Sequence, residues 1–212
     1  MASVKRIILA SKSPFRRQLL ATTGLIFAAD QAPVDEYATQ NSDPQELARQ
    51  RSEAKAMAMA RTVEAADSLV IGADQVLSLD GEAFDKVTTL AEARTRLQRL
   101  AGKTHILHTG MALALGSLAG QPARLLVSRV IDIKMPMRQL DASQIEAYLA
   151  TGEWEGSVGC YQFENRGVNL FKDVWADGAA IVGLPLQTLQ ADLRQLGINA
   201  LVKPHPPWDI VI

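Results

Sequence analysis

The chain has 212 residues, of which 48% are hydrophobic and 21% charged, and its formal net charge is −1. This length fits one large α/β domain or two closely joined lobes, and the near-zero charge gives no overall field that would attract nucleic acid or an acidic membrane. The single cysteine, Cys160, excludes an internal disulfide framework and a cysteine-rich zinc module, and the three histidines lack the spacing of metal ligands. Because no segment is apolar for long enough to span a membrane and the N-terminal apolar run is too short for a secretory signal, we expect a cytoplasmic protein.

The first elements along the chain predict an anion site. Residues 6–10 (RIILA) are typical of a buried strand, and residues 14–23 are typical of a helix capped by Ser13. Arg16 and Arg17 would then lie in the first turn, at the positive end of the helix dipole, where cations are disfavoured unless an anion binds. A strand, a Ser-rich loop and a helix N-terminus with two arginines therefore predict a phosphate site.

Further elements follow in an α/β order. The hydrophobic patterns predict strands over residues 26–32, 67–74, 76–84 (as a hairpin), 104–116 and 123–135, and helices over residues 44–61, 90–100, 142–150 and 185–196. Residues 167–183 predict another hairpin, and the Pro-rich tail, residues 198–212, is expected to wrap the surface. Early strand–helix alternation followed by long paired strands favours a mixed sheet over a purely parallel one. Neither a G-x-G-x-x-G fingerprint nor a P-loop is present, so neither motif supports the predicted phosphate site.

Eight short motifs occur in the order in which the Maf family has them. They are LASKSPFRRQLL, VDE, RSEAKA, IGADQV, DGEAFDKV, AGKTHILHTG, EAYLATGE and VGLPL, and the match runs from Ile8 to about Gly197. The chain therefore resembles the Maf nucleoside triphosphate pyrophosphatases over nearly its whole length. The resemblance implies an α/β fold like that of the inosine triphosphate pyrophosphatases. In that fold a mixed, elongated central sheet is wrapped by helices, and the active-site cleft lies between two lobes of a single domain, here residues 1–212.

The resemblance also implies an activity, which is cleavage of a nucleoside triphosphate to a nucleoside monophosphate and pyrophosphate with a divalent metal cation, Mg²⁺ or Mn²⁺. The expected partner is a small-molecule nucleotide, and neither nucleic acid nor a membrane is expected. Homodimers are common in such families, although this sequence does not show one. A nucleotide-binding regulator of septum formation and cell division is the alternative from a different class.

Asp74 and Glu36 are the candidate catalytic and metal-binding carboxylates. Asp74 ends the strand predicted over residues 67–74, so its carboxylate is expected to be exposed at the C-terminal edge of that strand. The resemblance makes Asp74 the proton acceptor that activates water, and a metal ligand; without the motif, a turn-capping aspartate would be the better interpretation. Glu36 lies in a polar loop, and hard oxygen ligands suit Mg²⁺, so it is assigned a metal or water-positioning role ahead of Asp35.

The residues that the resemblance assigns to the triphosphate are Ser13, Arg16, Arg17, Lys55 and Lys86. Arginine forms paired hydrogen bonds to phosphate and keeps its charge at any relevant pH. Two other interpretations stay open, a plain helix cap for Ser13 and a solvated helix face for Lys55. The Gly-Lys-Pro turn of the family has neither its glycine nor its proline here, which leaves the placement of Lys86 open.

Three positions divide the family by substrate, and here they are Phe15, Gln75 and Glu164. This pattern resembles the branch that hydrolyses 7-methyl-GTP rather than the branch that acts on dTTP and UTP. The physical chemistry agrees, because N7 methylation makes guanine cationic, which favours an aromatic face such as Phe15. A carboxylate such as Glu164 can accept from two adjacent guanine donors. Core packing of Phe15 and a surface position of Glu164 remain the alternatives, and a dTTP/UTP pyrophosphatase is the alternative function within the family.

Overall fold

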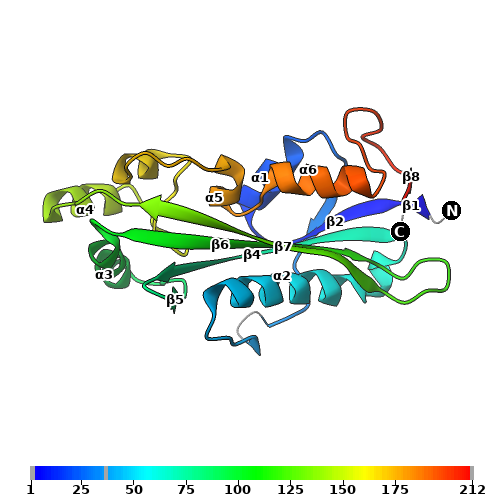
Figure 1. The fold of residues 1–212 in the computed structure, drawn as a ribbon, viewed down its shortest axis with the longest axis horizontal. Helices are drawn as coiled ribbons and strands as arrows, with labels where there is room; N and C mark the ends of the chain where they lie inside the picture. Colours follow the sequence, from blue (N-terminus) through cyan, green and yellow to red (C-terminus); the bar gives the residue numbers. More distant parts are fainter. Residues whose placement is uncertain (1–2, 36–37, 211–212) are drawn as a thin grey trace.

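The computed structural model describes residues 3–35 and 38–210. Within these residues the main sheet has the strand order β3-β2-β4-β6-β7, with β5 also beside β4, and β1 and β8 form a separate pair (Figure 1). The strands are β1 (Ser3–Val4), β2 (Arg6–Ala10), β3 (Ala28–Asp30), β4 (Ser68–Leu79), β5 (Glu82–Phe84), β6 (Thr104–Leu115), β7 (Arg124–Pro136) and β8 (Trp208–Asp209).

The main sheet is mixed, as the sequence predicts. β2 runs parallel to β3 and to β4, whereas β5 and β6 run antiparallel to β4, and β7 runs antiparallel to β6. Long antiparallel strands in the centre and short parallel strands at one edge give the elongated sheet of Figure 1.

Helices cover both faces of this sheet. The α-helices are α1 (Pro14–Ala21), α2 (Pro44–Ala60), α3 (Leu90–Leu100), α4 (Ala142–Leu149), α5 (Gly178–Val182) and α6 (Leu186–Gln195), and the 3-10 helices are η2 (Val63–Ala65) and η3 (Arg166–Leu170). α2 packs on β4, β6 and β7 from one face, and α1, α5 and α6 lie on the other (Figure 1). None of the helices in the described part of the chain is long and apolar enough to cross a membrane.

The helix starts predicted at residues 14, 44, 90 and 142 are confirmed, and the helix predicted from residue 185 begins at Leu186. Ser13, Asp43, Thr89 and Asp141 each occupy the N-cap position, and each side chain accepts a backbone N–H of the first turn. Such caps satisfy donors that the helix leaves without intrahelical partners.

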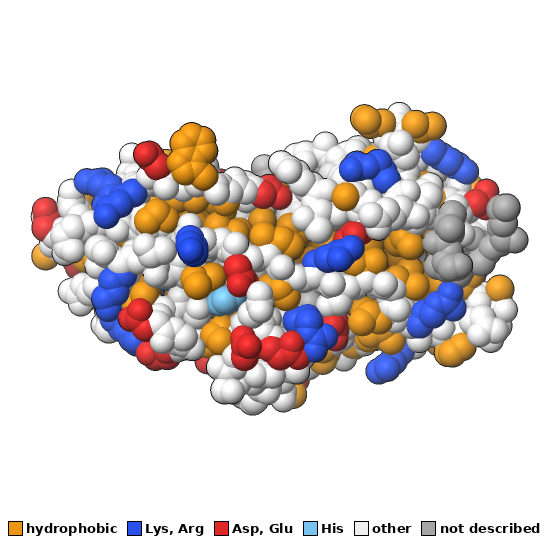
Figure 2. Space-filling model, viewed as in Figure 1, with side chains coloured by type: hydrophobic (Ala, Val, Ile, Leu, Met, Phe, Trp, Pro, Cys, Tyr) orange, Lys and Arg blue, Asp and Glu red, His pale blue; other side chains and the backbone are white. Residues whose placement is uncertain are grey.

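Two large apolar clusters lie at opposite ends of the long strands. One lies beneath α3 and α4 and includes Leu97, Met135 and Tyr148. The other lies near β1 and β8 and includes Leu9 and Trp208. β4, β6 and β7 run through both clusters and join the two lobes. On the visible surface, acidic and basic side chains are interspersed (Figure 2).

Three expectations about the elements are wrong. The strand expected to end at Asp74 continues without a break to Leu79, so Asp74 lies in the middle of β4. The hairpin expected over residues 167–183 is absent from the described chain, where η3 and α5 occupy most of that span. The tail does not simply wrap the surface, because β8 pairs with β1 and Trp208 is buried in the core.

Candidate active site

A cleft of about 380 Å³ opens beside the middle of β4. β6 pairs with one edge of β4 continuously from Leu69 to Ser78. The other edge is paired with β2 over residues 68–71 and with β5 over residues 77–79. In the described structure this leaves residues 72–76 without a strand partner on that edge, and the cleft forms there, between the two lobes.

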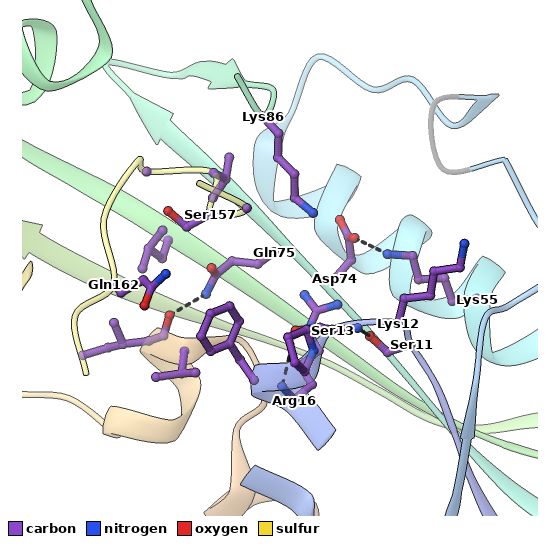
Figure 3. Close-up of a pocket in the computed structure, with 18 of the residues that line it drawn as sticks. Ser11, Lys12, Ser13, Arg16, Lys55, Asp74, Gln75, Lys86, Ser157 and Gln162 are labelled. Carbon is purple, nitrogen blue, oxygen red and sulfur yellow. Dashed lines mark hydrogen bonds and ion pairs between the residues drawn. The ribbon is translucent and has the colours of Figure 1, made fainter. Parts of the chain in front are cut away.

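A buried ion pair lies at this gap. Asp74 on β4 and Lys55 on α2 are 6% and 5% exposed, and Lys55 Nζ lies 2.6 Å from Asp74 Oδ1 (Figure 3). The carboxylate expected at an exposed strand end is therefore enclosed, yet it lines the cleft. Burial also excludes the solvated-face interpretation of Lys55. Burying both charges has a desolvation cost, which their mutual attraction offsets. Replacing either residue by a neutral one would therefore leave the other as an uncompensated buried charge.

Cationic side chains surround this pair. Lys86 reaches toward Asp74 from the segment after β5 (Figure 3), although its flanking residues depart from the family pattern. Lys12, which the sequence analysis passed over, also lines the cleft from the loop before α1. Its position between Ser11 and Ser13, in a predicted phosphate loop, was the signal that could have identified it.

The two adjacent arginines of α1 lie in different surroundings. Arg16 lines the cleft; its Nε donates to the carbonyl oxygen of Gly183 and its Nη1 to that of Ala73, both at 2.9 Å. Arg17 is exposed on α1 and is not among the described residues that line the cleft. Ser13 is the predicted helix cap, since its hydroxyl accepts the backbone N–H of Arg16 at 3.3 Å, and it also lines the cleft.

The other wall of the cleft holds the three predicted specificity residues. Phe15, Gln75 and Glu164 all line it. Gln162 also lines this wall and was not foreseen, because nothing in its local sequence separates it from an ordinary loop residue. Glu164 lies in an exposed part of the loop formed by residues 156–164.

This loop, residues 156–164, is held from several sides. The Tyr148 hydroxyl accepts the backbone N–H of Gln162 at 3.0 Å. Arg96 Nη1 donates to the carbonyl oxygen of Val158 at 2.7 Å, and Nη2 donates to that of Asp85 at 2.9 Å, so Arg96 joins this loop to the segment that carries Lys86. Burial lowers the pKa of the Arg96 guanidinium, but it remains a cation.

Cys160 belongs to the same loop but has no nucleophilic character. It is fully buried, and burial raises the pKa of its thiol to about 11. A thiol with such a pKa stays protonated near neutral pH, and the thiolate is the reactive species. Cys160 therefore does not supply a nucleophile to the cleft.

The donor set for a metal is small. Asp74 supplies a hard carboxylate oxygen at the cleft, and Glu36, the other predicted ligand, lies outside the described residues. No group of three or more His, Cys, Asp or Glu side chains in the described part of the chain is placed to hold a metal ion. The Asp74 carboxylate, in a cleft lined by cationic side chains, fits Mg²⁺, which takes one or two carboxylates together with phosphate oxygens of a ligand.

Comparison with known proteins gives one family. Residues 6–196 match the model of the Maf-like protein family. A nucleoside triphosphate pyrophosphatase of Nitrobacter hamburgensis is 41% identical over 201 residues, covering 93% of this chain and 96% of the relative. A 7-methyl-GTP pyrophosphatase of Rhizobium johnstonii is 38% identical over 200 residues, covering 91% and 96%. A HAM1 protein from Coxiella burnetii is similar in structure, with a TM-score of 0.43, 14% identity and coverage of 89% of this chain and all of that one.

Proposed function

The chain belongs to the Maf family, and from this premise we propose that it hydrolyses 7-methyl-GTP to 7-methyl-GMP and pyrophosphate. One observation carries the proposal: the Asp74–Lys55 ion pair lies in the same cleft as Phe15, Gln75 and Glu164. A carboxylate suited to proton transfer and side chains suited to a cationic purine thus line one cleft, where a single nucleotide could contact both. Relatives named 7-methyl-GTP pyrophosphatase support this choice of substrate.

The triphosphate occupies the cationic end of the cleft in this proposal. Lys86 and Lys12 neutralise the terminal phosphates, and Arg16 binds beside the α1 N-terminus. The positive end of the α1 dipole adds to this field, because a helix start favours anions. Holding the reacting groups in one geometry removes much of the entropic barrier.

Asp74 is the proton acceptor. Lys55 holds Oδ1 of the carboxylate, which leaves Oδ2 to take a proton from a water molecule. The water oxygen bonds to the α-phosphorus while the bond from that phosphorus to the bridging oxygen breaks, and pyrophosphate leaves with the electron pair. Positioned proton transfer of this kind contributes about 10²–10⁴-fold to rate.

Mg²⁺ or Mn²⁺ is the proposed cofactor. Asp74 would hold it together with oxygens of the triphosphate itself. When bound, such an ion stabilises the negative charge that develops on the phosphates.

The base is recognised at the other wall. 7-Methylguanine carries a positive charge, and an aromatic ring such as that of Phe15 attracts a cation by about 0.5–2 kcal/mol. Its N1–H and exocyclic amine are adjacent donors, which the Glu164 carboxylate accepts. Uracil and thymine present one N–H between two carbonyls and match a carboxylate poorly.

The first test is pyrophosphate release from 7-methyl-GTP, GTP, UTP and dTTP with Mg²⁺ or Mn²⁺. We expect preference for 7-methyl-GTP, metal dependence, and a loss of about 10²–10⁴-fold in kcat for Asp74→Asn. Preference for UTP or dTTP would instead make the chain a pyrimidine triphosphate pyrophosphatase. Tight nucleotide binding without turnover would support the regulatory alternative.

A further inference from the structure

We propose that Thr109 is a positioning residue for the nucleobase wall, and that it fixes which end of the Gln75 amide faces the substrate. Thr109 lies on β6 directly opposite Gln75 of β4 in the strand register, and its side chain is fully buried. The inference rests on the proposed function and adds a residue that touches neither phosphate nor base.

The hydroxyl of Thr109 has a defined direction. It donates to the carbonyl oxygen of Ala180 in α5 at 2.9 Å, and this uses its only proton. Toward Gln75 it can therefore only accept, and Gln75 Nε2 lies 2.9 Å from Thr109 Oγ1.

Two further acceptors enforce the same orientation. Gln75 Nε2 lies 3.2 Å from the carbonyl oxygen of Ala180 and 3.0 Å from that of Ile181. All three of these partners of the amide nitrogen are acceptors, and a flipped amide would place its oxygen against three oxygens. The assignment of nitrogen and oxygen follows from this network, which is how amide orientation is decided.

The consequence for recognition is an acceptor in the cleft. With its nitrogen held by α5 and Thr109, Gln75 presents Oε1 toward the side that carries Ser157 and Gln162 (Figure 3). Together with Glu164 this wall offers acceptors, which suit the N1–H and amine donors of a guanine. A pyrimidine has two carbonyl oxygens beside its N–H, and these would face the acceptor oxygens of Gln75 and Glu164 without a hydrogen to share.

The same contacts seat α5. At the C-terminal end of α5 the carbonyl oxygen of Ile181 accepts the Gln75 side chain. The carbonyl oxygen of Ala180 accepts the Thr109 hydroxyl in addition to the backbone N–H of Gly183. Ile181 also lines the cleft, so a shift of α5 would change the shape of the base wall.

Thr109→Val tests the proposal, because it keeps the shape and removes the hydroxyl, and Thr109→Ser is its matched control. We measure Kd for 7-methyl-GTP by titration calorimetry, and kcat and KM for 7-methyl-GTP and UTP. For Thr109→Val we expect Kd and KM for 7-methyl-GTP to rise on the order of 3- to 10-fold, the effect of one hydrogen bond, with kcat and the UTP constants within about 2-fold. Thr109→Ser should stay within about 2-fold throughout.

A merely structural role predicts a different result: a lower melting temperature and a kcat reduced equally for both substrates, with Kd and KM unchanged. That result overturns the inference. If Thr109→Val does not fold, Thr109→Ala against Thr109→Ser makes the same comparison, because these two variants differ only in the hydroxyl. The proposed function fails separately, in a wild-type enzyme that releases no pyrophosphate, and the Kd comparison still decides the role of Thr109.

Discussion

At the scale of single residues, position on a helix decides what two identical side chains do. Arg16 and Arg17 are adjacent, but successive helical residues point about 100° apart. Arg16 therefore reaches back to β4 and to the residue after α5, while Arg17 faces solvent.

We expect Arg16→Ala to lower kcat/KM for 7-methyl-GTP by about 10- to 100-fold, because hydrogen bonds from a charged group are worth about 1.5–3 kcal/mol each. Arg17→Ala is the matched control and should stay within about 2-fold. Steady-state pyrophosphate release measures both. Equal losses in the two variants would contradict the assignment.

His105 shows the same dependence on surroundings. It is fully buried, its Nε2 lies 2.8 Å from the Tyr161 hydroxyl, and burial lowers its pKa from 6.5 to about 3. The folded state thus keeps this ring neutral where the unfolded chain would protonate it.

Stability should therefore fall as the pH drops below 6.5. Below that pH the unfolded state binds a proton at this histidine and the folded state does not. The free energy of unfolding then falls by about 1.4 kcal/mol per pH unit for one such group. Chemical denaturation between pH 7.5 and 5 should show a shallower fall for His105→Phe than for the wild type. His205→Gln, which removes an exposed histidine, should keep the wild-type slope; an unchanged slope in His105→Phe would refute the prediction.

A chain of Ser78, His108 and Asp132 shows that hydrogen-bond geometry alone does not make an active site. Ser78 Oγ lies 2.8 Å from His108 Nε2, and His108 Nδ1 lies 2.7 Å from Asp132 Oδ1. The serine is buried and none of the three lines the described cleft. These side chains join β4, β6 and β7 within the sheet.

At the scale of elements, close approach of α2 to the sheet brings Lys55 to Asp74. A Cβ built on Gly72 would lie 2.3 Å from the carbonyl oxygen of Ser52 and 2.6 Å from the backbone nitrogen of Ala56. Only glycine fits this contact, which lies two residues before Asp74 along β4.

Gly72→Ala should push α2 outward. We expect it to lower the unfolding free energy by about 1–3 kcal/mol, as overpacking does, and to reduce pyrophosphate release as the ion pair separates. Gly178→Ala is the control, because a Cβ there meets open space. Thermal melts and rates of the two variants should differ clearly; similar values would show that α2 adapts without cost.

The wrongly predicted hairpin also belongs to this scale. The Asp177–Gly178 pair is a common hairpin turn signal, but here Asp177 caps α5 and accepts the N–H of Ala179 at 2.9 Å. An Asp-Gly pair is locally compatible with both a hairpin turn and a helix N-cap. Contact of α5 with Gln75 and Thr109, which are distant in sequence, selects the helix.

At the scale of the whole molecule, the C-terminal segment closes one lobe. Trp208 is 1% exposed, packs in the same cluster as Leu9, and donates from Nε1 to the carbonyl oxygen of Lys203 at 2.8 Å. The pairing of β8 with β1 brings the described ends of the chain together (Figure 1).

We expect Trp208→Ala to lower the unfolding free energy by about 3–5 kcal/mol, as for other large core truncations. Trp175 is 93% exposed, so Trp175→Ala should change the unfolding free energy by less than about 0.5 kcal/mol. Urea denaturation compares them. Comparable stabilities would mean that the tail is not part of the core.

The sequence by itself determined the features whose causes are local. The caps at Ser13 and Asp43 and the strand periods are read over a few residues, since a cap or a turn needs only its neighbours. The resemblance to the family, carried by motifs spread along the chain, placed Asp74, Phe15 and Glu164 among the candidate site residues, and all three line the cleft.

Only the tertiary structure decided how these residues meet. Four features depend on strand register and on contacts between distant segments. They are the gap along β4, the ion pair of Lys55 with Asp74, the hydrogen bonds from Gln75 to α5, and the burial of Trp208. Burial is a property of the assembled layers. A carboxylate or a tryptophan therefore has the same local sequence whether the fold encloses it or leaves it in water.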